Sequence, residues 1–171
     1  GTGKAGFSGD GGPALAAEFN GPHNLAVLPD GNVLIGDTWA GRVRKVDVKA
    51  GTVTSLAGYT VPAEKARSSG PYCITLDFTG TKLFIADLTR IHELDLTSGK
   101  SRVVAGNGKK GRPEDGAVAT EAPLVDPRAV APDRKGNLYI LERGGNALRV
   151  VTPDGKIKTV VNASGKKGGT G

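Results

Sequence analysis

Three polar side chains occupy matching places in the sequence, each directly after a proline. They are His23, Tyr72 and Arg128, and Asn24 follows the first of them. These groups donate and accept hydrogen bonds, and the guanidinium of Arg128 carries a fixed positive charge. Side chains of this kind, gathered at one place, can bind a small anion or a polar ligand. The alternative is that they only line a water-filled space.

A second recurring feature is an acidic residue at the end of a short apolar run, at Asp37, Asp87 and Glu142. Carboxylates at equivalent places could hold a metal ion. An acid at a strand end can also accept hydrogen bonds from backbone N–H groups of the next turn, which fixes that corner of the sheet. We expect this structural role for all three acids.

Catalytic signals are scarce. The chain has two histidines and one cysteine, and it lacks HExxH, CxxC, GxSxG and Walker motifs. Cys73 cannot form an internal disulfide and stands in an apolar run, so we expect a buried thiol. The Gly-rich segment 6–12 offers one carboxylate, Asp10, where a calcium loop needs several, which favours a structural turn. The sequence thus predicts no catalytic residue, no cofactor and no metal, with His23 as the candidate ligand if a metal does bind.

All of these residues belong to a segment that occurs three times. Each copy contains a proline, an apolar strand, a Gly turn, an apolar strand ending in an acid, a third strand, a Gly turn and a fourth strand. Four such strands in about forty residues form an antiparallel meander, the size of one β-propeller blade. We therefore expect an all-β propeller fold of four-stranded antiparallel blades, three in this chain. The expected order is an inter-blade leader at 1–20, blade 1 at 21–58, blade 2 at 69–105, blade 3 at 126–162 and a flexible tail at 163–171.

Three stretches resemble the NHL repeats of six-bladed β-propellers. They are GPHNLAVLPDGNVLIGDTWAGRVRKVD at 21–47, DPRAVAPDRKGNLYILERGGNALRVV at 126–151, and a leader, GFSGDGGPALAAEFNGP, typical of bacterial NHL proteins. The middle copy departs from the pattern, because its second turn is two residues shorter. The resemblance implies that the strand after each proline lines the central channel, so His23, Asn24, Tyr72 and Arg128 would face the channel mouth. It implies either a binding module or a metal-dependent enzyme with a metal in that channel.

Charge and composition limit the partners. The net charge is +6, and Arg42, Arg44, Lys156 and Lys158 alternate along strands in a way that predicts outward, solubilising side chains. The functional alternative is binding to a polyanion. Aromatic residues make up 5% of the chain, too few for the stacking that single-stranded nucleic acid requires, so we do not expect a nucleic acid partner. No apolar run is long enough to suggest a membrane partner.

Three blades cannot close a ring, because both end blades would expose an apolar face. Two chains packed head to tail about a two-fold axis would give six blades and cover both faces. We therefore expect a homodimer, in which the polar mouth residues are doubled into a ring of six. The chain begins Gly-Thr-Gly-Lys and ends Gly-Gly-Thr-Gly, which suggests one half of a duplicated parent, whether natural, excised or engineered.

The combined expectation is a non-enzymatic NHL-type binding or scaffold module that assembles into a six-bladed ring. Its partners would be a second copy of the chain and a small anionic or polar ligand, or a protein. The alternative is a metal-dependent lyase or hydrolase-type propeller with a channel metal near His23. The sequence carries no signal for a cellular location, and an extracytoplasmic bacterial location is one option.

Overall fold

The computed structural model describes residues 1–162, and they form three four-stranded antiparallel sheets with the strands in sequential order. The all-β fold of propeller blades is confirmed, and the flexible tail expected at 163–171 lies outside the described residues. Within residues 1–162, no helix has the length and apolar character that crossing a membrane requires.

Each blade is built from four consecutive strands, and β4 runs two residues beyond residue 58, where blade 1 is expected to end. Blade 1 contains β1 (Asn24–Val27), β2 (Val33–Asp37), β3 (Arg42–Asp47) and β4 (Thr52–Thr60). Blade 2 contains β5 (Cys73–Leu76), β6 (Lys82–Ala86), β7 (Ile91–Asp95) and β8 (Ser101–Ala105). Blade 3 contains β9 (Pro127–Pro132), β10 (Leu138–Glu142), β11 (Ala147–Val151) and β12 (Ile157–Val161). Short helices occur at η1 (Ala14–Ala16), η2 (Thr38–Ala40), η3 (Ala63–Lys65) and α1 (Ala66–Ser69).

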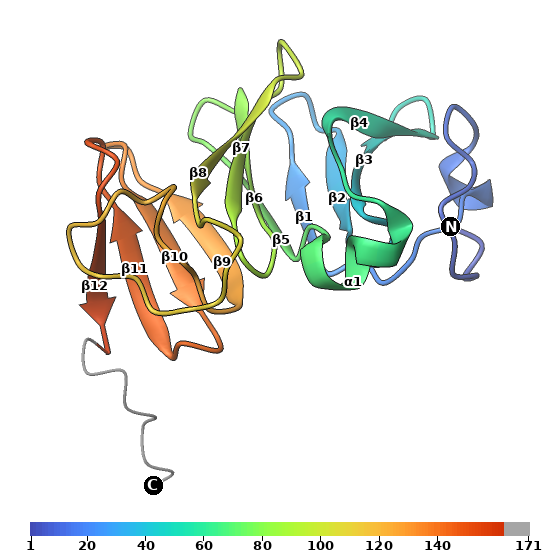
Figure 1. The fold of residues 1–171 in the computed structure, drawn as a ribbon. Coiled ribbons are helices and arrows are strands. Elements are labelled where there is room, and N and C mark those ends of the chain that lie inside the picture. Colours follow the sequence, from blue (N-terminus) through green and yellow to red (C-terminus); the bar gives the residue numbers. More distant parts are fainter. Residues whose placement is uncertain (163–171) are drawn as a thin grey trace, which may run out of the picture.

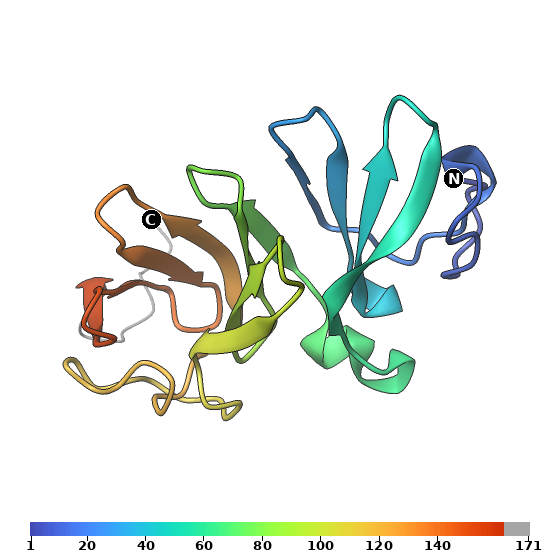
Figure 2. The same ribbon diagram turned by 90° about the horizontal axis from the view of Figure 1, so that it is seen from above.

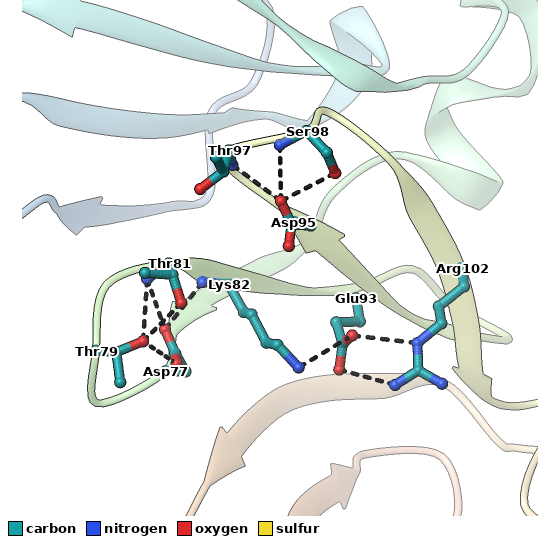
Figure 3. Close-up of polar contacts among 9 residues, drawn as sticks. All are labelled: Asp77, Thr79, Thr81, Lys82, Glu93, Asp95, Thr97, Ser98 and Arg102. Carbon is teal, nitrogen blue, oxygen red and sulfur yellow. Dashed lines mark hydrogen bonds and ion pairs between the residues drawn. The ribbon is translucent and has the colours of Figure 1, made fainter.

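Aspartates fix the hairpin turns. In the turn between β5 and β6, Asp77 accepts hydrogen bonds from the backbone N–H groups of Thr81 and Lys82 (Figure 3). Asp95 does the same for Thr97 and Ser98 in the turn between β7 and β8. The hydrogen bonds from Ser98 lower the pKa of Asp95. Such local bonds explain why the turns can be located from the sequence.

The three sheets radiate like a fan from their first strands (Figures 1 and 2). β1 contacts β5, and β5 contacts β9, so the strands that follow the prolines lie at the centre of the fan. Each joint between blades holds one apolar core. The first contains Leu34 and Val43 of blade 1 with Ile74, Leu83, Ile85 and Leu94 of blade 2. The second contains Cys73, Phe84, Ala86 and Ile91 of blade 2 with Val130, Leu138 and Ile140 of blade 3. Cys73 is a buried free thiol, as expected.

The two long linkers cover the outer strands of blades 1 and 3. In the leader, the Gly11 N–H donates to the Val53 carbonyl of β4, and the Val53 N–H donates to the carbonyl of Gly12. In the linker at 106–125, Gly116 and Ala117 bond Ile157 of β12 in the same way. Figure 2 shows the leader beside β4 and the second linker beside β12. Both linkers therefore act as an additional edge to their sheet.

A buried arginine pairs with the acid at the end of the second strand in blades 1 and 3. Arg149 Nε lies 2.8 Å from Glu142 Oε2, and Arg44 Nη1 lies 3.6 Å from Asp37 Oδ2. Arg44 also contacts Asp10 of the leader at 2.8 Å. Burial raises the pKa of Asp37, while the hydrogen bond from Asn20 and the charge of Arg44 oppose the rise.

The expectation that Arg44 points outward to solvent is wrong, because its side chain is 0% exposed. Strand alternation places Arg44 on one face of the sheet but does not reveal that the leader covers that face. Lys158 is exposed, in line with the expectation, and Arg42 and Lys156 are half-buried. Asp10 is engaged by Arg44 and by the hydroxyl of Ser55, so the segment 6–12 is a structural turn that seals the arginine.

Blade 2 varies this arrangement. Its hairpin between the second and third strands is two residues shorter, and His92 takes the place of the arginine. His92 Nε2 lies 3.1 Å from Asp87 Oδ2. Asp87 also accepts hydrogen bonds from the N–H groups of Thr89 and Arg90, so it closes its own tight corner. In the other two blades the acid bonds a backbone N–H of the preceding linker, at Asn20 and Val125.

Replacement of Arg149 tests the buried pair. Arg149→Leu leaves Glu142 as an unpaired buried charge, so we expect the free energy of unfolding to fall by about 3–5 kcal/mol. The matched control is Lys158→Leu in the same sheet, where an exposed lysine should change stability by less than about 0.5 kcal/mol. Urea unfolding measures both. Equal stability of the two variants would contradict the importance of the pair.

We expect the free energy of unfolding to fall in acid, because of the aspartates in the hairpin turns. Hydrogen bonds lower the pKa of Asp95, Asp133 and Asp154 below the ordinary value of 3.8. A carboxyl whose folded pKa is lowered stabilises the fold above its unfolded pKa and loses that contribution as pH falls through the folded value. The urea midpoint should therefore drop below pH 4. An Asp95→Asn, Asp133→Asn double variant should lose less between pH 7 and pH 3 than the wild-type chain does.

Candidate functional site

The structure brings three of the four expected site residues into one row at the start of the inner strands. The rings of His23 and Tyr72 lie 5.0 Å apart between their centroids, and the guanidinium of Arg128 lies 4.3 Å above the ring of Tyr72. The row crosses all three blades, because His23 and Tyr72 directly precede an inner strand and Arg128 is the second residue of one. His23 is exposed, and Tyr72 and Arg128 are half-buried.

Two residues that the sequence did not assign to the site extend the row. The ring of Trp39, in η2, lies 5.6 Å from that of His23, and the guanidinium of Arg67 in α1 lies 4.4 Å above Trp39. The hydroxyl of Tyr72 donates to the carbonyl of Arg67 at 2.6 Å, which ties α1 to the row. Trp39 stands in the turn between two strands, and no pattern in the sequence pairs it with His23. Nothing in the sequence of the short linker pointed to Arg67, because its place depends on how η3 and α1 fold back.

Asn24, the fourth expected site residue, has a structural role. Its side-chain oxygen accepts a hydrogen bond of 3.0 Å from the backbone N–H of Ile74 in β5. This bond crosses the joint between blades 1 and 2. Asn24 therefore holds two inner strands together beneath the row, and its oxygen is not presented to a ligand.

Arg128 is held in place by an aspartate with an unusual backbone. Asp126 has a φ of 53°, a left-handed conformation that non-glycine residues seldom adopt. Its carboxylate lies between two arginines, with Oδ1 2.9 Å from Arg128 Nε and Oδ2 2.9 Å from Arg143 Nε. The ion pair of Arg128 with Asp126 uses Nε, which leaves the two terminal nitrogens available in the part of the chain that the structure describes. These nitrogens are the groups that Arg128 can offer to an anion.

The row has an excess of positive charge. Arg128 and Arg143 share one carboxylate, that of Asp126, and Arg67 lies over Trp39 at the other end of the row. Cations stacked on aromatic faces form a surface that suits a flat anion, since the rings supply stacking area and the guanidinium groups supply paired N–H donors. The arrangement thus fits a small organic anion better than a cation.

The three acidic candidates have structural partners instead of a place in the row. Asp37, Asp87 and Glu142 are buried at the corners described above, each bonded to a backbone N–H group. In residues 1–162, no group of three or more His, Cys, Asp or Glu side chains could hold a metal ion. His23 contacts the carbonyl of Gly21 through Nδ1 at 2.8 Å and is flanked by aromatic rings.

Comparison with known sequences shows which repeat family the first blade resembles. Residues 19–46 match the model of the NHL repeat, which covers the leader's end, β1, β2 and most of β3. The chain is 30% identical over 168 residues to human teneurin-1, a match that covers 90% of this chain and 6% of teneurin-1. This chain therefore corresponds to a small part of that relative. The resemblance to NHL-repeat proteins is confirmed.

Solved structures share the fold. An auxiliary nutrient binding protein from Bacteroides thetaiotaomicron superposes with a TM-score of 0.66 at 19% identity, over 84% of this chain and 36% of that protein. Virginiamycin B lyase from Staphylococcus aureus gives a TM-score of 0.57 at 20% identity, over 83% of this chain and 42% of the lyase. At this level of identity the likeness concerns the arrangement of blades alone.

Proposed function

We propose that this NHL-repeat chain is a non-enzymatic binding module that holds a small organic anion at the start of its inner strands. The observation that carries the proposal is the row of Arg67, Trp39, His23, Tyr72 and Arg128, in which three neighbouring rings lie between two guanidinium groups. Arg128 would bind the anionic group through its terminal nitrogens, and the exposed edge of His23 would contact the flat body of the ligand. The fold shared with nutrient-binding proteins supports this class of function.

We further propose that two copies of the chain close a six-bladed ring. In blade 3, Val130 and Ile140 stand opposite each other on the face that packs against blade 2, and both are buried. Their counterparts in blade 1 are Leu25 and Ile35, on the outer face of the fan. Leu25 is 60% exposed. This face of blade 1 is therefore built like a joint but has no blade beside it among the described residues.

The other end of the fan shows the complementary feature. In blade 2, Ala86 and Ala105 lie on the face that packs against blade 3, and both are fully buried. Their counterparts in blade 3 are Leu141 and Val161, which are 51% and 55% exposed. Blade 3 of one copy could thus pack on blade 1 of the next copy as blade 2 packs on blade 3. Two such contacts would close the ring and bring two ligand rows to one opening.

Charge insertion at the two end faces tests ring closure. Light scattering should give a mass of twice 17.5 kDa for the 171-residue chain. Leu25→Asp and Leu141→Asp should each give monomers, because a buried unpaired charge opposes the contact. Val48→Asp, at an exposed turn residue away from these faces, should remain dimeric.

Mixing the two charge variants distinguishes a broken contact from a misfolded chain. Leu25→Asp retains an intact blade 3 face, and Leu141→Asp retains an intact blade 1 face. An equimolar mixture can therefore form one native contact, and it should contain dimers although neither variant dimerises alone. A wild-type monomer, or no dimer in the mixture, would overturn the proposed closure.

Binding of benzoate tests the anion site, with benzamide as the uncharged control. We expect benzoate to perturb the His23 and Tyr72 resonances in an NMR titration and benzamide to do so only at much higher concentration. Arg128→Gln should weaken benzoate binding about tenfold or more, the loss that follows when a charge-assisted hydrogen bond is removed. Lys110→Gln, in the exposed part of a linker, should bind as the wild type does. Equal affinity for benzoate and benzamide would contradict the proposal.

A further inference from the structure

The outer edge of blade 2 differs from the outer edges of its two neighbours. Three residues occupy equivalent places in the outer strands of the blades: Val53 of β4, Ser101 of β8 and Ile157 of β12. Each stands opposite the equivalent residue of the third strand of its blade. Val53 and Ile157 both bond a Gly-containing linker segment through their N–H and C=O groups. In residues 1–162, no other segment bonds the backbone of Ser101 on that side.

The reason is the length and path of the preceding linker. The segments before blades 1 and 3 are long enough to return along the outer strand. The linker before blade 2 folds into η3 and α1, and α1 packs against η2 near the start of the inner strands. It therefore does not reach β8. The far half of β4 does approach blade 2, since the ring of Tyr59 lies 5.3 Å from that of His92 and Gly58 lies close to the carbonyl of Gly99. Within residues 1–162, no backbone bond joins β4 to Ser101.

A cleft of about 770 Å³ lies beside this open edge, between blades 2 and 3. The equivalent cleft between blades 1 and 2 measures about 230 Å³. The difference has a local cause. Leu94 and Leu96 fill the first joint, and their counterparts in blade 3 are the smaller Val151 and Pro153. The cleft lies at the turn end of the blades, opposite the row of His23 and Tyr72.

The cleft combines an apolar floor with a charged rim. Its floor includes Phe84, Leu138 and Val151, and β8 contributes Val103 and Val104 to its wall. On the rim, Glu93 accepts hydrogen bonds from Arg102 through both carboxylate oxygens, at 3.1 and 3.2 Å, and Lys82 Nζ lies 3.5 Å away (Figure 3). Figure 3 shows these three side chains on the side of blade 2 that faces the strands of blade 3.

We propose that β8 is a docking edge for an extended peptide, whose backbone pairs antiparallel with Ser101 and whose apolar side chains enter the cleft. The two neighbouring blades supply the template, because the bridges of Pro13 to Thr52 and of Val118 to Lys156 are both antiparallel. An unpaired edge strand accepts an added strand through main-chain hydrogen bonds, and a pocket beside it selects alternate side chains. On the rim, the charge of Glu93 is already paired with Arg102 and Lys82, so the ligand need not supply a charge. A peptide backbone, which is uncharged, meets this condition. The proposal is independent of ring closure and of the anion site.

The probe is a fluorescein-labelled peptide of alternating serine and leucine, acetylated and amidated at its ends. Fluorescence anisotropy should show binding to the wild-type chain, and amide hydrogen exchange at Ser101 should slow when the peptide is bound. The same peptide with N-methylated leucines cannot form the main-chain bonds and should not bind. Binding of the N-methylated peptide, or no binding of the parent peptide at millimolar concentration, would overturn the proposal.

Three variants locate the site. Ser101→Pro removes the outward N–H and should weaken binding about tenfold, whereas Ser101→Thr keeps it and should bind as the wild type does. Val104→Phe reduces the cleft and should also weaken binding. Circular dichroism confirms that each variant is folded. If Ser101→Pro binds normally, the peptide lies elsewhere. If the Ser101 amide is already protected in the unliganded chain, another part of the chain or a second copy covers β8, and the proposal fails.

Discussion

A four-stranded sheet with two apolar faces must bury both of them, and the structure of this protein depends on that constraint. Each blade is too thin to have a core of its own, so the cores lie in the joints between blades. The joints in turn place β1, β5 and β9 side by side at the centre of the fan. The same requirement remains unmet at the outer faces of blades 1 and 3, where Leu25 and Leu141 are exposed.

The linkers between blades cover the outer strands of blades 1 and 3, which the sheets leave open. In blades 1 and 3 the linker lies along the outer strand and closes over a buried arginine, which pairs with Asp37 or Glu142. An ion pair of this kind is weak evidence of stability, because removing both ions from water is costly. The ion pair instead fixes the positions of three segments, since it joins the end of the second strand, the third strand and the linker. Blade 2 uses His92 and a tighter hairpin in place of this arrangement, and within residues 1–162 no linker bonds its outer strand at Ser101.

The same linkers determine where binding surfaces form. The short linker before blade 2 folds toward the start of the inner strands, where α1 adds Arg67 to the row of aromatic rings. Because this linker does not cover β8, an open edge and a cleft remain at the other side of the same blade. One shortened connection thus accounts for a feature of the candidate anion site and for the proposed peptide edge. The two surfaces lie at different parts of the blade, so each can be altered without the other.

The sequence alone determined the strands, the turns and the order of the blades. These features depend on residues close together in the chain, such as Asp77 with Thr81, or the glycine at position 31 with its positive φ. It also placed His23, Tyr72 and Arg128 at equivalent positions, because a repeat keeps its register. Only the tertiary structure decided that Arg44 is buried, that Asn24 bonds Ile74, that Arg67 joins the site and that the second joint contains a cleft. The physical reason is that burial and contact depend on how separate blades and linkers pack, and side chains far apart in the sequence set that packing together.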